Sequence, residues 1–148
     1  MTPDVGPLDE LGRAHVVIGP PPAVRMPGAP GARSHLADGR VVSWHPPLPA
    51  GVRLAVDAEI ADQPVPPALA RRFGIDRPEA FWPRWTAVEV ACKLLDVPIM
   101  VWLSEIGLRV DPGLVRTATF RTADLLVTVG TARGAADAAT ATVAARAS

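Results

Sequence analysis

The chain has 148 residues, 15 basic and 15 acidic side chains, and a formal net charge of zero. A chain of this length is most simply one domain with its own hydrophobic core. The balanced charge argues against nucleic-acid binding, and no apolar run is long enough to predict a membrane span. The single cysteine, Cys92, rules out an intramolecular disulfide among these residues. Because the first residues also lack the pattern of a secretory signal, we expect a cytoplasmic protein.

Residues 1–32 are expected to form an N-terminal arm. The stretch GPPPAVRMPGAPGA at 19–32 is so rich in proline and glycine that neither a helix nor a central strand is predicted there. The run AHVVIGP just before it is compatible with a short strand.

Residues 33–130 carry clearer patterns and are expected to form the folded domain. β-Branched runs at 40–45 and 52–60 predict two strands, paired like a hairpin across PPLPAG. The segment 67–74 predicts a short helix that ends at Gly74.

The stretch FWPRWTAVEVACKLLDV at 81–97 predicts a long helix. Its apolar residues Trp85, Val88, Cys92 and Leu95 recur at helical spacing, and Pro83 suits a first turn. Cys92 therefore lies on the apolar face, which favours a buried, inert thiol over a nucleophile.

Three strand-like runs follow at 99–110, 114–120 and 125–130, separated by the turn signals DPG and RTAD. Strands, then helices, then strands predict an α+β fold with an antiparallel sheet packed on the long helix. Residues 131–148 are alanine-rich and weakly patterned, so a frayed helix and a disordered tail both stay open.

Four charged residues in the middle of the chain predict a site. Asp57 and Glu59 lie two apart at the end of a strand and so share one face. Glu89 and Lys93 lie one turn apart on the long helix. If that helix crosses the strand end, three carboxylates meet beside one ammonium. Oxygen ligands suit Mg²⁺ and a lysine suits a phosphate, so the pattern predicts chemistry on a phosphate ester or anhydride.

A plain surface explanation competes with this site. Acidic pairs at strand ends and a glutamate four residues before a lysine are common on solvated faces. Lys93, however, is the one lysine of a chain that carries 14 arginines. A composition that replaces lysine by arginine elsewhere favours a specific use for the lysine that is kept.

These residues resemble a known family. VDAE at 56–59 and WTAVEVACK at 85–93 are similar to the paired signature motifs of the 4′-phosphopantetheinyl transferases, and the family's Ser-His pair corresponds to Ser34 and His35. The resemblance covers about residues 33–130. It implies an enzyme that moves the phosphopantetheine arm of coenzyme A to a serine of an acyl or peptidyl carrier protein.

The resemblance also implies roles for matched residues. Asp57, Glu59 and Glu89 would hold Mg²⁺, and Glu89, or a water that it orients, would take the proton of the serine hydroxyl. Lys93 would contact a phosphate of coenzyme A. Ser34 and His35 would help to seat its nucleotide end, although His35 taken alone could equally be a structural histidine.

Three differences from the family, at Val88, at Ala55 and in the missing second half, keep an alternative open. Val88 stands where the second motif has a lysine, and Ala55 stands where the first has a glycine. The family builds its site between two similar halves, so a single half implies a homo-oligomer, trimer or dimer. The alternative is a retained fold without transferase activity, which binds or modifies an intermediate tethered to a carrier protein.

Overall fold

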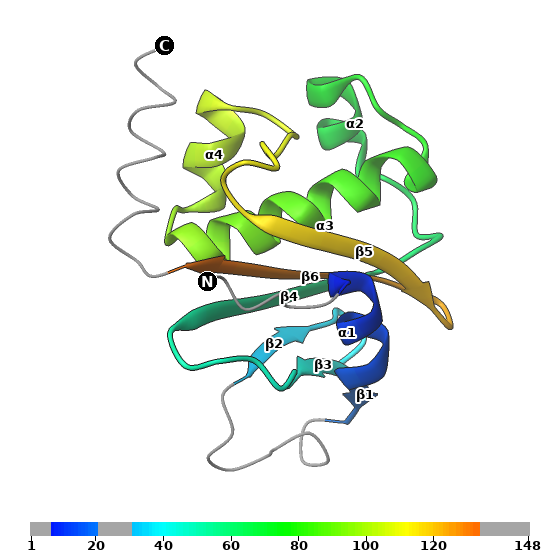
Figure 1. Ribbon diagram of the computed structural model, residues 1–148. Helices are drawn as coiled ribbons and strands as arrows, with labels where there is room; N and C mark the ends of the chain where they lie inside the picture. Colours follow the sequence, from blue (N-terminus) through cyan, green and yellow to red (C-terminus); the bar gives the residue numbers. More distant parts are fainter. Residues whose placement is uncertain (1–6, 21–30, 134–148) are drawn as a thin grey trace.

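The computed structural model describes residues 7–20 and 31–133 (Figure 1). In chain order its helices and strands are α1 (Leu8–His15), β1 (Val16–Gly19), β2 (Ala32–His35), β3 (Val41–Trp44), β4 (Val52–Ile60), α2 (Pro67–Phe73), α3 (Pro78–Leu95), α4 (Ile99–Glu105), β5 (Arg116–Thr122) and β6 (Leu125–Arg133). No helix in this part of the chain is long and apolar enough to cross a membrane.

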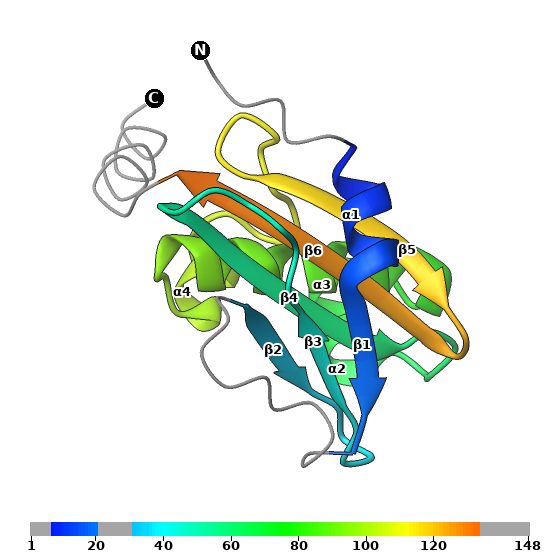
Figure 2. The ribbon, with the colours of Figure 1, turned by 60° about the horizontal axis from the view of Figure 1, so that its bottom comes forward.

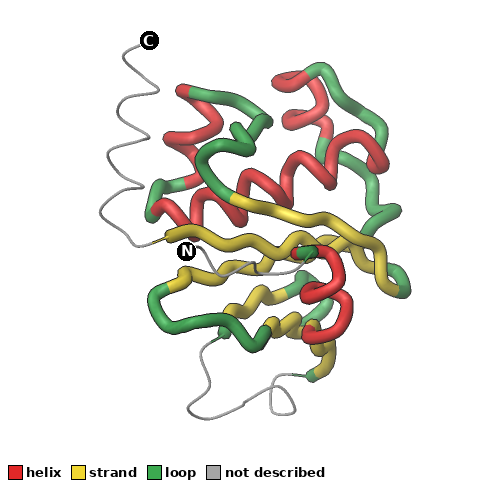
Figure 3. Tube along the Cα trace, in the orientation of Figure 1, coloured by secondary structure: helices red, strands yellow, loops and turns green. Residues whose placement is uncertain are grey.

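The strands form two antiparallel sheets of three strands each. One has the order β4-β6-β5 and the other the order β1-β3-β2. Helices α2, α3 and α4 lie on one side of β4-β6-β5, and α1 with the second sheet lies on the other side (Figures 1 and 3). The turned view shows α1 lying across β5 and β6 (Figure 2). The mixed α+β class expected from the sequence is confirmed.

The sheet β4-β6-β5 separates two hydrophobic cores because its side chains alternate between its faces. On β6, Leu126 and Ala132 belong to the core under α3. Leu125, Val127 and Val129 belong to the core shared with α1 and the second sheet. The middle sheet is therefore covered on both faces, and α3 lies directly on its β4 and β6 strands.

The expected hairpin between the runs 40–45 and 52–60 is wrong. Both runs are strands, but β3 pairs with β1 and β2, whereas β4 pairs with β6. All four residues of β3 are buried, and both of its edges already carry a partner. No edge of β3 is left for β4, so the proline-rich connection carries the chain from one sheet to the other.

The strand expected at 99–110 is also wrong, because its first part is the helix α4. Pro98 caps that helix, and Trp102 and Leu103 point into the core. The indole of Trp102 donates a hydrogen bond to the carbonyl of Arg109, 3.1 Å away, which closes the segment after the helix. Burial of a large aromatic anchor at helical spacing outweighs the strand propensity of the β-branched residues here.

The long helix begins earlier than the sequence indicates. Pro78, not Pro83, occupies its first turn, and Pro83 lies inside the helix. A proline there removes one hydrogen bond, to the carbonyl of Glu79. That residue lies exposed in the first turn, where water can replace the missing donor.

The ends of the folded part differ from the expected division of the chain. The helix α1 and the strand β1 both lie within residues 1–32, and 131–133 complete the strand β6. The helix α1 has no counterpart among the sequence predictions. The rest of the tail, 134–148, and most of the proline-rich stretch, 21–30, lie outside the described residues.

Candidate functional site

Asp57 lies at the centre of the candidate site, on the face of β4 that α3 covers. Its side chain is 9% exposed. Lys93 on α3 places its ammonium 3.1 Å from Oδ1 of Asp57 and 2.9 Å from the carbonyl oxygen of Val56. The hydroxyl of Ser34 on β2 donates to the same Oδ1 at 3.0 Å. Three elements far apart in the sequence therefore meet at one carboxylate oxygen.

The second oxygen of Asp57 has no such partners. Oδ2 is buried and receives no hydrogen bond from the residues described. A buried carboxylate oxygen without a donor is rare and costly. The pKa of Asp57 is raised, first because burial disfavours the charged carboxylate, although the Lys93 ammonium and the Ser34 hydroxyl both lower it. The site is therefore short of positive charge.

Glu59 and Glu89 extend the negative charge around Asp57. Both are partly buried, and burial is the main reason that the pKa of each is raised. The charges of Asp57 and Glu89 raise the pKa of Glu59 further, and the charge of Asp57 does the same for Glu89. The amide of Gln63 donates to Oε2 of Glu59 at 2.8 Å and lowers its pKa. The three carboxylates thus interact across the gap between β4 and α3.

A row of hydroxyls continues the polar contact beneath α3. Thr128 on β6 is the register partner of both Asp57 on β4 and Thr119 on β5. Its Oγ1 lies 2.7 Å from Oγ1 of Thr119 and 2.7 Å from Oγ1 of Thr86 on α3. Thr86 lies three residues before Glu89, so these bonds fix α3 on the sheet close to the carboxylates.

The family resemblance pairs His35 with Ser34 and does not single out Arg53, and the structure places both residues differently from Ser34. His35 follows Ser34 on β2 and is exposed, so its side chain lies on the other face of the strand, away from Asp57. Arg53 shares the α3-facing side of β4 with Asp57, and its guanidinium lies 3.5 Å from the carbonyl oxygen of Lys93. The structure therefore brings Ser34, but not His35, to the carboxylates.

A group of oxygen ligands of this kind suits a hard divalent cation. Within 7–20 and 31–133, no three His, Cys, Asp or Glu side chains come close enough together to hold a metal by themselves. Mg²⁺ does not need such a cage, because it commonly binds one or two carboxylates and completes its shell with water and phosphate oxygens. The orphaned, buried Oδ2 of Asp57 is the observation that fits a cation here.

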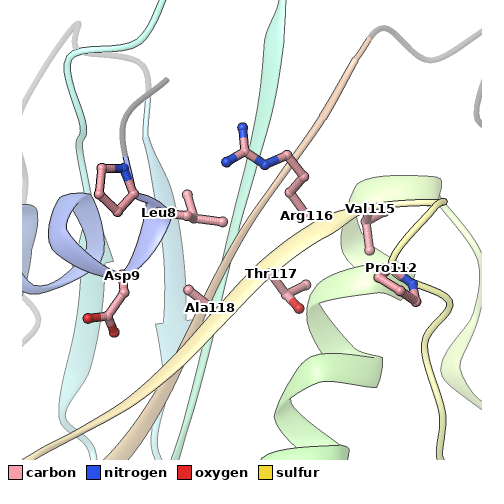
Figure 4. Close-up of a pocket in the computed structure, with 8 residues that line it drawn as sticks. Leu8, Asp9, Pro112, Val115, Arg116, Thr117 and Ala118 are labelled. Atoms are coloured by element: carbon pink, nitrogen blue, oxygen red, sulfur yellow. The ribbon is translucent and has the colours of Figure 1, made fainter. Parts of the chain in front are cut away.

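Two other features lie apart from this chemistry. Cys92 is 5% exposed, so the expected burial of this residue is confirmed, and burial raises the pKa of its thiol to about 12. A shallow pocket of about 390 Å³ lies between the start of α1 and β5 (Figure 4). It is lined by Pro7, Leu8, Asp9, Pro112, Val115, Arg116, Thr117 and Ala118. The strand β5 is at the opposite edge of the sheet from β4, so this pocket is separate from the carboxylates.

Comparison with known proteins adds no relative: no family model, no curated protein and no solved structure matches this chain.

Proposed function

We propose that this protein transfers the 4′-phosphopantetheine arm of coenzyme A to a serine of an acyl or peptidyl carrier protein. The observation that carries the proposal is the ion pair between Asp57 and the single lysine of the chain, with Glu59 and Glu89 near enough to interact with it electrostatically. Three interacting carboxylates beside one ammonium suit a substrate that brings phosphate groups and a divalent cation together.

In this proposal Mg²⁺ would bind among Asp57, Glu59 and Glu89, with one or two of these carboxylates as direct ligands and with water and phosphate oxygens completing its shell. The cation would offset the negative charge of the pyrophosphate and of the phosphate that leaves. This assignment is supported by Oδ2 of Asp57, which is buried and receives no hydrogen bond from the described residues.

Lys93 and Glu89 have separate roles in the proposed reaction. The ammonium of Lys93 is partly exposed and can turn from Asp57 towards a phosphate oxygen of coenzyme A. Glu89 accepts the proton of the carrier serine, and a raised pKa makes its carboxylate a stronger base than an ordinary glutamate. The serine oxygen bonds to the phosphorus that carries pantetheine, and the bond from that phosphorus to the nucleotide phosphate breaks.

Ser34 acts on Asp57 in this proposal. Its hydroxyl is buried and already donates to Oδ1, so it orients the carboxylate and does not reach the nucleotide directly. The exposed His35 stays available for the nucleotide end of coenzyme A. A second copy of the chain, in a dimer or a trimer, would supply the other wall of the site.

Intact-protein mass spectrometry tests the transfer. An apo carrier protein is incubated with this chain and coenzyme A, with Mg²⁺ or with a chelator. The expected result is a Mg²⁺-dependent gain of one phosphopantetheine arm that Glu89→Gln abolishes. Glu105→Gln is the matched control, because Glu105 is an exposed carboxylate on α4. No mass gain across several carriers, from folded protein, would contradict the proposal.

A second candidate is a retained fold that binds or modifies a carrier-tethered intermediate without transferring the arm. One observation favours it: Val88, at the position where the family motif has a lysine, is fully buried. No side-chain charge from that position can reach a phosphate. In this case binding of coenzyme A or of a loaded carrier, measured by calorimetry, would need neither Mg²⁺ nor Glu89.

A further inference from the structure

Gln63 joins the end of β4 to the long helix. It lies in the turn that follows β4, and its side-chain amide donates to Oε2 of Glu59 at 2.8 Å. Its main-chain carbonyl accepts a hydrogen bond from the indole Nε1 of Trp82, 2.9 Å away. Its main-chain N–H donates to the carbonyl of Ile60 at 3.3 Å. One residue therefore contacts the strand, its own turn and the helix α3.

Trp82 is a rigid attachment point for this turn. The residue is 5% exposed, and its ring packs edge-on against Phe81, with ring centroids 4.9 Å apart. Trp82 and Glu89 belong to the same helix, two turns apart. The position of Glu59 relative to Glu89 is therefore set through Gln63 as well as through the packing of α3 on the sheet.

Glu59 needs such a partner because its neighbours repel it. The carboxylates of Asp57 and Glu89 both disfavour a negative charge on Glu59. An amide donor holds the carboxylate by a hydrogen bond to a charged acceptor, which is stronger than one between neutral groups. Gln63 holds Glu59 in this way without adding a charge. It bonds to Oε2, so the other carboxylate oxygen of Glu59 stays available to a cation.

We propose that Gln63 is a positioning residue for a divalent cation: it holds Glu59 at a fixed distance from α3, and so from Glu89, before the cation arrives. The inference rests on the proposed function, since it assigns Glu59 to the same metal. Residues that orient a metal ligand by a hydrogen bond, without contacting the metal themselves, contribute about 10- to 100-fold to metal affinity. Gln63 is expected to contribute in this range.

The test is the binding of Mn²⁺ alone to the full chain. The electron paramagnetic resonance signal of the free ion measures how much Mn²⁺ stays unbound. Gln63→Met keeps the length of the side chain and the main-chain carbonyl but removes the amide donor. It should weaken Mn²⁺ binding by about tenfold or more. Trp82→Phe removes the other attachment and should weaken binding in the same direction. Asp62→Asn is the matched control in the same turn, because Asp62 is exposed and pairs with Arg121 on β5.

A second measurement separates positioning from a general loss of structure. In the transfer assay, Gln63→Met should raise the Mg²⁺ concentration for half-maximal rate by a similar factor, while saturating Mg²⁺ restores kcat. Thermal unfolding of each variant shows that the fold is kept, and Gln63→Asn, one methylene shorter, provides a second variant with the same expected direction.

The outcomes distinguish this inference from the proposed function. Mn²⁺ binding by the wild type with equal affinity in Gln63→Met overturns the role of Gln63 and leaves the metal site standing. A loss of kcat in Gln63→Met that saturating Mg²⁺ does not restore also overturns positioning. Absence of Mn²⁺ binding by the wild type overturns both.

Discussion

The ammonium of Lys93 lies 3.1 Å from Oδ1 of Asp57 and 2.9 Å from the main-chain carbonyl oxygen of Val56, the residue just before it. The two acceptors are neighbours on β4, and the lysine crosses to them from α3. A compact ammonium with three donors can serve both at once, whereas the planar guanidinium of arginine presents its donors in a fixed fork. This geometry gives a physical reason for a lysine at position 93 in a chain that otherwise uses arginine.

Removal of the Lys93 charge should destabilise the fold. Lys93→Met leaves the buried carboxylate of Asp57 without its counter-ion. Breaking a fully buried pair in this way costs about 3–5 kcal/mol. Because the lysine side chain is 38% exposed, we expect a smaller loss, about 1–2 kcal/mol of the free energy of unfolding. Urea unfolding measures it, and Arg84→Met, an exposed charge on the same helix, is the control.

A double-mutant cycle assigns that loss to the pair. Asp57→Asn combined with Lys93→Met should be more stable than the sum of the two single changes predicts, by about 1 kcal/mol. Strict additivity would show that the two side chains do not interact in solution.

The charge-conserving change Lys93→Arg tests whether catalysis needs the shape of the lysine ammonium and not only its positive charge. Arginine keeps the positive charge but cannot reproduce the ammonium contacts with Asp57 and a phosphate in the same space. We expect kcat/KM for carrier loading to fall by about tenfold or more, which corresponds to about 1.4 kcal/mol of transition-state stabilisation. Full activity of Lys93→Arg in the mass-spectrometric assay would remove the argument for a lysine-specific role.

The pH dependence of stability should show that the site disfavours the charged form of Glu89. Burial raises the pKa of Glu89 in the folded state, so the folded state holds this proton to a higher pH than the unfolded state does. The contribution of Glu89 is therefore most favourable at low pH and is lost as the pH rises through the raised pKa. Glu89→Gln avoids that loss.

The midpoint of thermal unfolding, measured from pH 3.5 to 8, checks this sign. At pH 7 Glu89→Gln should unfold about 1–3 °C higher than the wild type, since solvent screening at this partly exposed site limits the gain to ~0.5 kcal/mol. The difference should vanish at pH 3.5, where both states are protonated. A variant that is less stable than the wild type at pH 7 would show that Glu89 is stabilised by its surroundings.

The local patterns in the sequence predict single elements better than the partners of those elements. The run 52–60 is a strand from end to end, and Gly74 ends α2 in the left-handed conformation with φ 67°. The pairing of β4 with β6, not β3, depends on which edges remain free, and no local pattern contains that information. The misassigned segment 99–110 has β-branched residues, but burial of Trp102 decides its conformation.

The candidate site shows the same division. Asp57, Glu59, Glu89 and Lys93 are recognisable from their spacing because each pair lies on one regular element. Gln63 has no such signal, since a turn residue contacts Glu59 through the path of the turn and not through a period. The hydroxyl row around Thr128 likewise requires the register of β5 against β6 and the packing of α3 on β6.

The close approach of α3 to β6 depends on the absence of a side chain at Gly130. A Cβ at this position would clash with the Val90 side chain and would lie 3.1 Å from Cδ1 of Leu94. Gly130→Ala should therefore push α3 away from the sheet and cost about 1–3 kcal/mol of unfolding free energy. Denaturant unfolding measures the loss. Gly113→Ala, at an exposed glycine before β5, is the control. Equal stability of the two variants would show that α3 does not pack as described.

The position of Val88 predicts what a restored motif lysine would do. Val88 is fully buried in the core around α3, with Phe81, Val90 and Leu95 in the same cluster. Val88→Lys would bury an unpaired ammonium, so it should lose about 3 kcal/mol or more of stability and gain no transferase activity. Val88→Met, of similar length without charge, separates overpacking from charge and should lose only about 1–2 kcal/mol. Urea unfolding measures the stability of both variants, and the carrier-loading assay measures their transferase activity. A stable and more active Val88→Lys would mean that position 88 faces the substrate, and that the orientation of α3 on the sheet differs from the one described.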